Sequence, residues 1–120
     1  MAAKFTELVI DAADPEALAA FWAEVLGYER IEGADEGEVE LKGPEGSGPT
    51  LLFVPVPEPK AVKNRVHIDV NPVGCDQAEE VERVLGLGAR PVDIGQGEQT
   101  WVVLADPEGN EFCILRTRRD

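Results

Sequence analysis

The sequence contains little cysteine and almost no histidine. Its 120 residues include two cysteines, Cys75 and Cys113, and one histidine, His67. The cysteines lack CxxC spacing and are too few for a disulfide-rich secreted scaffold, so they indicate no disulfide framework. A single histidine also excludes the iron site of two histidines and one carboxylate that serves dioxygen chemistry.

Positive charge is scarce as well. Eleven lysines and arginines stand against 24 aspartates and glutamates, which gives a net charge of −13. Such a chain repels nucleic acid and anionic membranes, so neither is expected as a partner. The charge favours a cationic ligand, although it also serves simply to keep a surface soluble.

Long hydrophobic runs are missing. No stretch approaches the roughly 20 apolar residues that a membrane helix needs. The N-terminus lacks the apolar block of a signal peptide. With 43% hydrophobic and 29% charged residues, the composition is that of one globular domain, and we expect it in the cytoplasm.

Hydrophobic periodicity predicts two helices and eight short strands. Asp14, Pro15 and Gly27 are the residues that begin and end a helix, here predicted over 14–26. A second helix is predicted after residue 74 and up to about Leu85, with Glu80 facing outward. The strands are predicted at 5–11, 28–32, 38–42, 50–56, 65–70, 89–93, 99–105 and 110–116.

The order of these elements repeats, which indicates an internal duplication. Each half reads as one strand, one helix and three strands. The fold class is therefore predicted as α+β, with two tandem βαβββ modules whose curved mixed sheets surround a cleft and whose helices lie outside. We place module one at 1–57, a linker at 58–64 and module two at 65–120.

The strand predicted at 65–70 alternates polar and apolar residues. Val66, Ile68 and Val70 are expected to face the core, which turns His67 and Asp69 toward the cleft. Glu7 holds the position in the first strand that matches His67. Polar side chains inside a cleft need a partner, water or a ligand.

Several stretches are similar to the vicinal oxygen chelate superfamily, which includes glyoxalase I, bleomycin-resistance proteins, fosfomycin-resistance enzymes and extradiol dioxygenases. They are the DPEALAAFW run that opens the first helix, the VLG that closes it, and the DPEGN hairpin at 106–110. The segment 57–69 resembles the small bacterial glyoxalase-like domain proteins in particular. The resemblance covers nearly the whole chain and implies the paired-module fold, but it does not specify an activity.

The resemblance also implies a metal site with one ligand from the first and one from the last strand of each module. Carried over, the positions are Glu7, His67, Cys113 and a fourth near Phe53, which cannot ligate. Metal-dependent members carry glutamate where this chain has Cys113. Glu7, His67 and Cys113 could hold Zn, Ni, Mn or Fe, with Glu111 as the candidate base or a replacement ligand.

Two functions remain open. One is a binder of a small, cationic or aromatic molecule without a complete metal site, with Glu7, His67, Asp69, Trp101 and Cys113 as ligand-binding residues. The other is a metal-dependent lyase or isomerase of the glyoxalase type, in which Glu111 and His67 are catalytic. A metal-free enzyme that uses His67 with Asp69 is a third reading without an identified nucleophile. Many members of the superfamily are homodimers, and the sequence does not choose between monomer and dimer.

Overall fold

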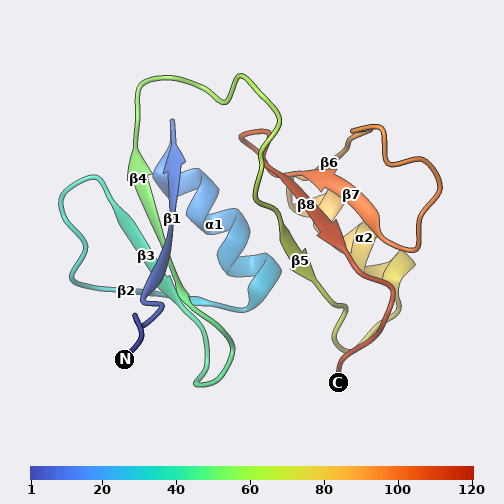
Figure 1. The fold of residues 1–120 in the computed structure, drawn as a ribbon, viewed down its shortest axis with the longest axis horizontal. Coiled ribbons are helices and arrows are strands. Elements are labelled where there is room, and N and C mark those ends of the chain that lie inside the picture. The colour runs from blue at the N-terminus through green and yellow to red at the C-terminus, as the bar shows by residue number, and fades with distance from the viewer. The chain divides into compact units, whose positions relative to one another are not determined.

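The computed structural model describes residues 1–120, which form two compact units, Met1–Pro59 and Lys60–Asp120. Each unit holds one helix and a four-stranded sheet of mixed strand direction, as Figure 1 shows for the two halves of the chain. The predicted α+β class with two tandem βαβββ modules is therefore confirmed. Neither helix is long and apolar enough to cross a membrane.

The first unit contains a sheet with the strand order β1-β4-β3-β2. Strands β1 and β4 run parallel, and the other neighbours are antiparallel. Helix α1 lies against one face of this sheet (Figure 1). The elements are β1 (Glu7–Ala12), α1 (Pro15–Leu26), β2 (Glu29–Ile31), β3 (Val39–Lys42) and β4 (Thr50–Pro55).

Helix α1 begins and ends where its capping residues predict. The side chain of Asp14 accepts a hydrogen bond from the backbone N–H of Ala17 at 3.1 Å, and Gly27 ends the helix in the left-handed conformation, with φ 68°. The inward stripe of α1 includes Trp22, which is 1% exposed and makes an edge-to-face contact with Phe21. This stripe packs on the buried side chains of β3 and β4, which are Val39, Leu41, Leu51 and Phe53.

Gly43 ends β3 at a place where the chain leaves no room for a side chain. A Cβ there would collide with the ring of Tyr28 and the hydroxyl of Ser47. We expect Gly43→Ala to lower the free energy of unfolding by about 1–3 kcal/mol, because neighbouring atoms must move apart. Urea denaturation measures this loss. Gly86→Ala is the matched control: Gly86 lies within a helix with nothing near its Cβ, so alanine should stabilise by about 0.5–1 kcal/mol.

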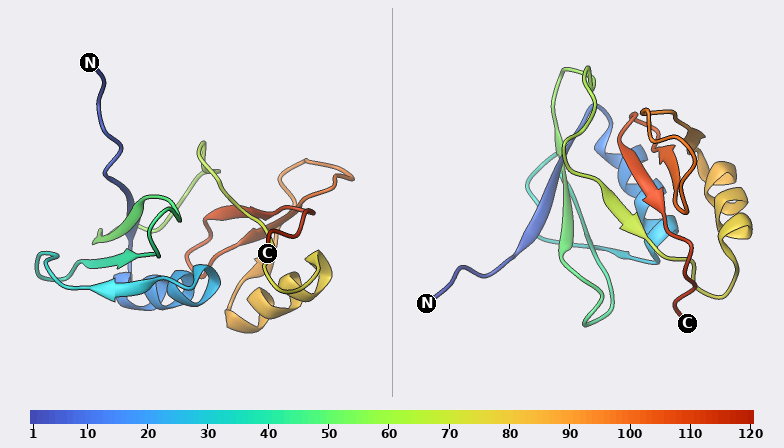
Figure 2. Two further views of the ribbon diagram at one scale, coloured as in Figure 1. Left: turned by 90° about the horizontal axis from the view of Figure 1, so that it is seen from below. Right: turned by 45° about the vertical axis from the view of Figure 1, so that its right-hand side comes forward.

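The second unit repeats the pattern with the strand order β5-β8-β7-β6. Strands β5 and β8 are parallel, and the other pairs are antiparallel. Helix α2 runs beside one face of this sheet (Figure 2), and the side-chain amide of Gln77 in its first turn donates to the carbonyls of Thr100 and Ile114. The elements are β5 (Ile68–Val70), α2 (Gln77–Leu87), β6 (Arg90–Pro91), β7 (Val102–Ala105) and β8 (Glu111–Ile114).

Two features of the second unit differ from the sequence prediction. Strand β5 begins at Ile68, so His67 precedes the strand, and Val66 is 71% exposed instead of facing a core. Helix α2 continues through Gly86 to Leu87 and is capped by Gly88. Glu80, predicted to face outward, is buried because Arg83 neutralises it at 2.8 Å.

Candidate functional site

The first sheet has one face packed on α1 and a second, opposite face, which we call the open face. Strand register places Ile31, Glu40, Leu52 and Val9 side by side across this open face. Their side chains point away from α1, because they alternate with the buried residues Leu41, Leu51 and Phe53. Val9 is 50% exposed. The open face thus has an apolar row interrupted by one carboxylate.

Further carboxylates border this row. Glu7 pairs with Thr50, and Asp11 pairs with Val54, so both acids share the open face with Val9. The predicted fourth ligand position near Phe53 falls on the opposite side of the sheet, where Phe53 is fully buried. Within the first unit, Glu7 therefore has acidic and apolar neighbours.

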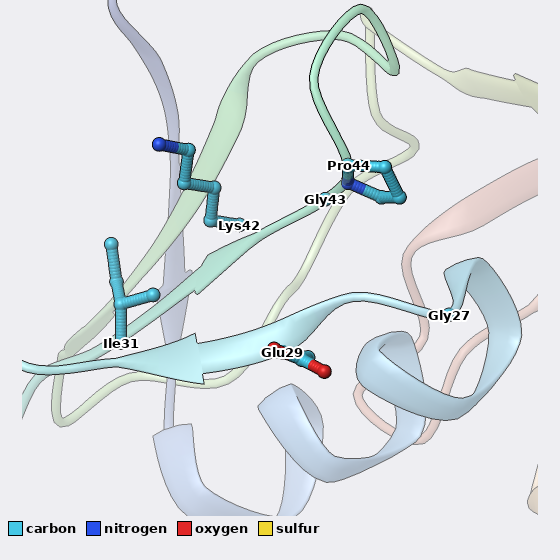
Figure 3. A pocket seen from close by; sticks show the side chains of 6 residues that line it. All are labelled: Gly27, Glu29, Ile31, Lys42, Gly43 and Pro44. Carbon is cyan, nitrogen blue, oxygen red and sulfur yellow. The ribbon is translucent and has the colours of Figure 1, made fainter.

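A shallow pocket lies at the β2–β3 edge of the same sheet. Its volume is about 240 Å³, and its walls include Glu29, Ile31 and Lys42, with Gly27, Gly43 and Pro44 completing the lining (Figure 3). Glu29 and Lys42 are register partners. The pocket is below the roughly 300–1,000 Å³ of typical ligand sites, so it suits a small fragment.

The second sheet also has a face turned away from its helix side, and three predicted site residues share it. Asp69 in β5 pairs with Cys113 in β8, and Glu111 lies two residues before Cys113 on the same face. Burial raises the pKa of the Cys113 thiol, and the charge of Asp69 and a hydrogen bond with it raise that pKa further. Cys113 therefore carries its proton at neutral pH.

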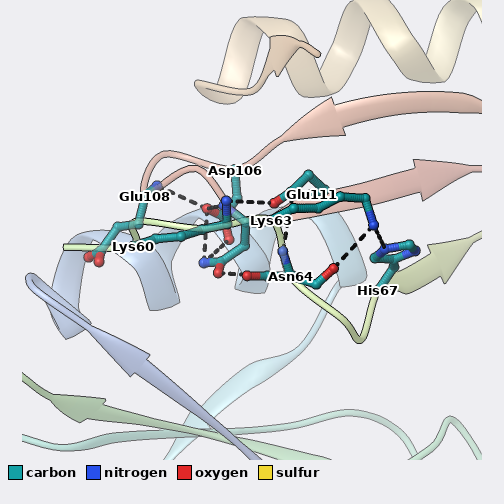
Figure 4. Close-up of polar contacts among 8 residues, drawn as sticks. Lys60, Lys63, Asn64, His67, Asp106, Glu108 and Glu111 are labelled. Atoms are coloured by element: carbon teal, nitrogen blue, oxygen red, sulfur yellow. Dashed lines mark hydrogen bonds and ion pairs between the residues drawn. The ribbon is translucent and has the colours of Figure 1, made fainter. Parts of the chain in front are cut away.

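Residues 60–67, which we call the strap, lie against this face of the second sheet (Figure 4). The ammonium group of Lys60 lies 2.9 Å from Glu111 Oε2, and the backbone N–H of Asn64 donates to Glu111 Oε1 at 3.1 Å. The side-chain amide of Asn64 also donates a hydrogen bond to Asn110 Oδ1 at 3.0 Å. The strap is thus held to the start of β8 by a buried carboxylate.

Glu111 is a buried, ionised acid. Its side chain is 4% exposed, and Oε2 makes no hydrogen bond of regular geometry, so it depends on the charge of Lys60. Burial alone would raise the pKa of this carboxyl. The contacts with Lys60 and with backbone N–H groups, that of Asn64 among them, outweigh burial and lower the pKa below its usual value.

His67, at the end of the strap, faces a second lysine. Its Nε2 lies 3.3 Å from the ammonium group of Lys63, which also donates to the Asn64 carbonyl (Figure 4). A charged ammonium can only donate, so a hydrogen bond between these two groups needs Nε2 as its acceptor. Asp69, which the sequence analysis pairs with His67, interacts with the Cys113 thiol.

Trp101 precedes β7 and is 38% exposed. Its position in the sequence is compatible with a core residue or with a ligand-stacking wall, and the observed exposure is that of a surface residue. By the alternation of side chains along the chain, Trp101 is on the same face as Val103 and Ala105, which are buried.

The donor set of the second unit does not fit a metal ion. Within each unit, no three His, Cys, Asp or Glu side chains gather in a way that could hold one. The individual donors also have other partners or a proton: Lys63 faces His67 Nε2, Lys60 faces Glu111, and Cys113 is a protonated thiol. A divalent cation needs free, deprotonated donors.

No local sequence pattern marks Lys60, Lys63 and Asn64 as site residues. Lys60 and Asn64 act through Glu111, which lies on a distant strand, and Lys63 contacts His67. Glu40 could have been found, because Val39–Lys42 alternates between apolar and charged residues.

The comparisons with known proteins agree with this fold. Residues 7–115 match the family model of the glyoxalase-like domain. A search among curated proteins finds no match.

Solved structures show the same architecture at low sequence identity. A glyoxalase/bleomycin resistance protein/dioxygenase family enzyme from Burkholderia phytofirmans is 21% identical over 93% of this chain and 97% of that chain, with a TM-score of 0.63. The fosfomycin resistance protein FosX from Listeria monocytogenes is 17% identical over 98% and 93%, with a TM-score of 0.73.

A mutant of the Listeria FosX, complexed with Mn(II) and 1S,2S-dihydroxypropylphosphonic acid, is 16% identical over 96% of this chain and 90% of that chain, with a TM-score of 0.69. With its two βαβββ units and its match over residues 7–115, the chain belongs to the glyoxalase-like domain family of the vicinal oxygen chelate superfamily.

Proposed function

We propose that this protein binds a small organic cation with an aromatic or apolar body, and that it does so without a bound metal. The observation that carries the proposal is the open face of the first sheet. There an apolar row of Val9, Leu52 and Ile31 is bordered by the carboxylates of Glu7, Asp11 and Glu40.

Apolar area and negative charge complement each other for such a ligand. The flat body of the ligand buries apolar surface against the row, which contributes about 25 cal/mol per Å². Its positive charge lies near several carboxylates in a chain whose net charge is −13. The attraction is partly exposed and therefore falls as salt is added.

The second unit supplies further proposed ligand contacts on its own surface. The half-exposed ring of Trp101 can stack on an aromatic body, and Asp69 is an exposed carboxylate beside Cys113. His67, beside Lys63 at 3.3 Å, is a further hydrogen-bonding group. The cleft between the modules and the homodimer remain predictions from the sequence.

A matched pair of probes tests the proposal. We expect N-methylacridinium to bind about tenfold more tightly than uncharged acridine in isothermal titration calorimetry at pH 7.5, because only the former carries a permanent charge. Glu40→Gln and Glu7→Gln should each weaken N-methylacridinium binding by roughly three- to tenfold, the effect of losing one nearby charge.

Glu45→Gln is the control, since Glu45 lies in the exposed loop after Gly43 and its replacement removes the same charge elsewhere. Equal affinity for both probes, or an equal loss in Glu45→Gln and Glu40→Gln, would contradict a specific cation site.

The second candidate is a metal-dependent lyase or isomerase of the glyoxalase type. The likeness to FosX, of which a mutant is complexed with Mn(II), favours it. It would need Glu7 and His67 as ligands with Cys113 or Glu111, and His67 and Glu111 as catalytic groups. The lysines that face His67 and Glu111 are the reason we rank it second.

A further inference from the structure

We propose that Lys60 and Lys63 exclude divalent metal ions from the second unit, because their ammonium groups occupy the donor atoms of Glu111 and His67. The two contacts are 2.9 Å for Lys60 with Glu111 Oε2 and 3.3 Å for Lys63 with His67 Nε2. In this unit two lysine ammonium groups therefore contact Glu111 and His67, two of the residues that the resemblance makes candidates for a metal site.

The Lys60 contact is the stronger of the two barriers. Glu111 is 4% exposed and the Lys60 side chain 22% exposed, so little water screens the pair. A metal ion could reach Glu111 only after Lys60 had left a buried carboxylate. Asn64 holds the strap in place through its own bonds to Glu111 and Asn110 (Figure 4).

The Lys63 contact acts on the lone pair of His67. A metal ion binds imidazole through a nitrogen lone pair, and the ammonium group of Lys63 already stands 3.3 Å from Nε2. A bound divalent cation at Nε2 would also lie close to the positive charge of Lys63. Both effects disfavour metal at this nitrogen.

Without the lysines, Glu111 and His67 would have free donor atoms for a cation. Asp69, Cys113 and Glu111 share this face of the sheet, and His67 lies two residues before Asp69. Carboxylate, imidazole and thiolate are ligands of Zn and, apart from the thiolate, of Mn. The lysines thus decide whether these donors are available.

Calorimetric titration of the full chain with Zn(II) tests the proposal. Lys60→Met/Lys63→Met should bind Zn(II) at least about tenfold more tightly than wild type. Lys4→Met/Arg116→Met is the matched control, because both residues are exposed and lie outside the strap, and the net charge changes equally. Equal Zn(II) affinity in the two double variants would overturn the proposal.

Because Lys60→Met removes the partner of a buried acid, a second variant covers the case of poor folding. Lys63→Met leaves the Lys60–Glu111 pair intact. His67 is the only histidine, so one pair of imidazole signals reports on it. Paramagnetic Mn(II) should broaden these signals in Lys63→Met and leave them sharp in wild type; identical spectra would overturn the role of Lys63.

Metal exclusion by the lysines rests on the proposed function, because both hypotheses require that the wild-type protein binds no metal. The Zn(II) titrations and the acridine titrations test the two hypotheses separately. Tight Zn(II) binding by wild type would refute both. A wild type that binds no Zn(II), together with lysine variants that bind none, would refute only the exclusion by Lys60 and Lys63. Organic cation binding on the first sheet is measured independently with the acridine pair.

Discussion

Lys60→Met is expected to lower the free energy of unfolding by about 3–5 kcal/mol, the usual cost of leaving one charge of a buried pair without its partner. Glu111 is 4% exposed, and Lys60 is the close partner of its Oε2. Urea denaturation followed by circular dichroism measures the loss. Hydrogen exchange of the β8 amides would locate it in the second unit.

The double variant Lys60→Met/Glu111→Gln is the control for this prediction. A glutamine at this position is neutral, and its side-chain oxygen still accepts from the backbone N–H of Asn64. Most of the lost stability should therefore return. A double variant as unstable as Lys60→Met would show that packing of the lysine chain, and not charge, causes the loss.

The Lys60–Glu111 pair makes the stability of the wild-type protein depend on pH. Because the pKa of Glu111 is lower in the folded than in the unfolded protein, the ionised carboxylate stabilises the fold above the unfolded pKa. This contribution disappears as the pH falls through the folded pKa. The stability difference between wild type and Glu111→Gln should accordingly shrink on acidification, and a difference that grew would contradict the assignment.

Asp106→Ala is the second change with a large expected effect, a loss of about 3 kcal/mol, because several buried donors lose their acceptor. Asp106 is 1% exposed and accepts from the backbone N–H groups of Glu108 at 2.9 Å and Asn110 at 3.0 Å. The Asn110 side-chain amide also donates to both of its carboxylate oxygens. These bonds fix the turn between β7 and β8.

The consequence of Asp106→Ala should reach the strap. Asn110 connects Asp106 to Asn64, which in turn binds Glu111 (Figure 4). Thermal unfolding should show the loss of stability. Hydrogen exchange should show faster exchange of the backbone N–H of Asn64. Asp106→Asn keeps one acceptor oxygen and should lose roughly 1 kcal/mol. Equal losses in the two variants would mean that these hydrogen bonds contribute little.

Local signals explain why the first helix was predictable. Asp14, Pro15 and Gly27 act within one helical turn of the residues they cap. The residues that decide where the helix begins and ends are therefore all neighbours in the sequence. The alternation in β1 and β3 is likewise local and separates the two faces of each strand, whereas the continuous apolar run of β4 leaves the face of Leu52 to the strand register.

Contacts between distant residues explain where the prediction fails. The alternation of 65–70 is that of a strand, but only 68–70 pair with β8, and just before them the backbone N–H of Asn64 donates to Glu111 instead of to a neighbouring strand. Glu80 is a local case: it is buried with Arg83, one helical turn away, as its ion-pair partner. A periodic pattern records polarity and cannot record which charge will neutralise which.

In the candidate site, too, the sequence predicts the residue types but not the contacts between distant residues. Glu7, His67, Asp69, Glu111 and Cys113 could be identified as chemically capable residues from their positions in the predicted strands. What the sequence could not provide was their partners, since Lys60 meets Glu111 only after β8 and the strap come together. Those partners are what separate a set of free metal ligands from a set of occupied ones.

The metal content of wild-type protein, purified without a histidine tag and dialysed against dilute chelator, distinguishes a metal-free binder from a metal-dependent enzyme. Elemental mass spectrometry should find Zn, Ni, Mn and Fe far below one ion per chain, because Lys60 and Lys63 occupy the donors of Glu111 and His67. A stoichiometric metal ion that survives dialysis and is lost in His67→Ala would contradict metal exclusion by the lysines and favour the metal-dependent lyase or isomerase.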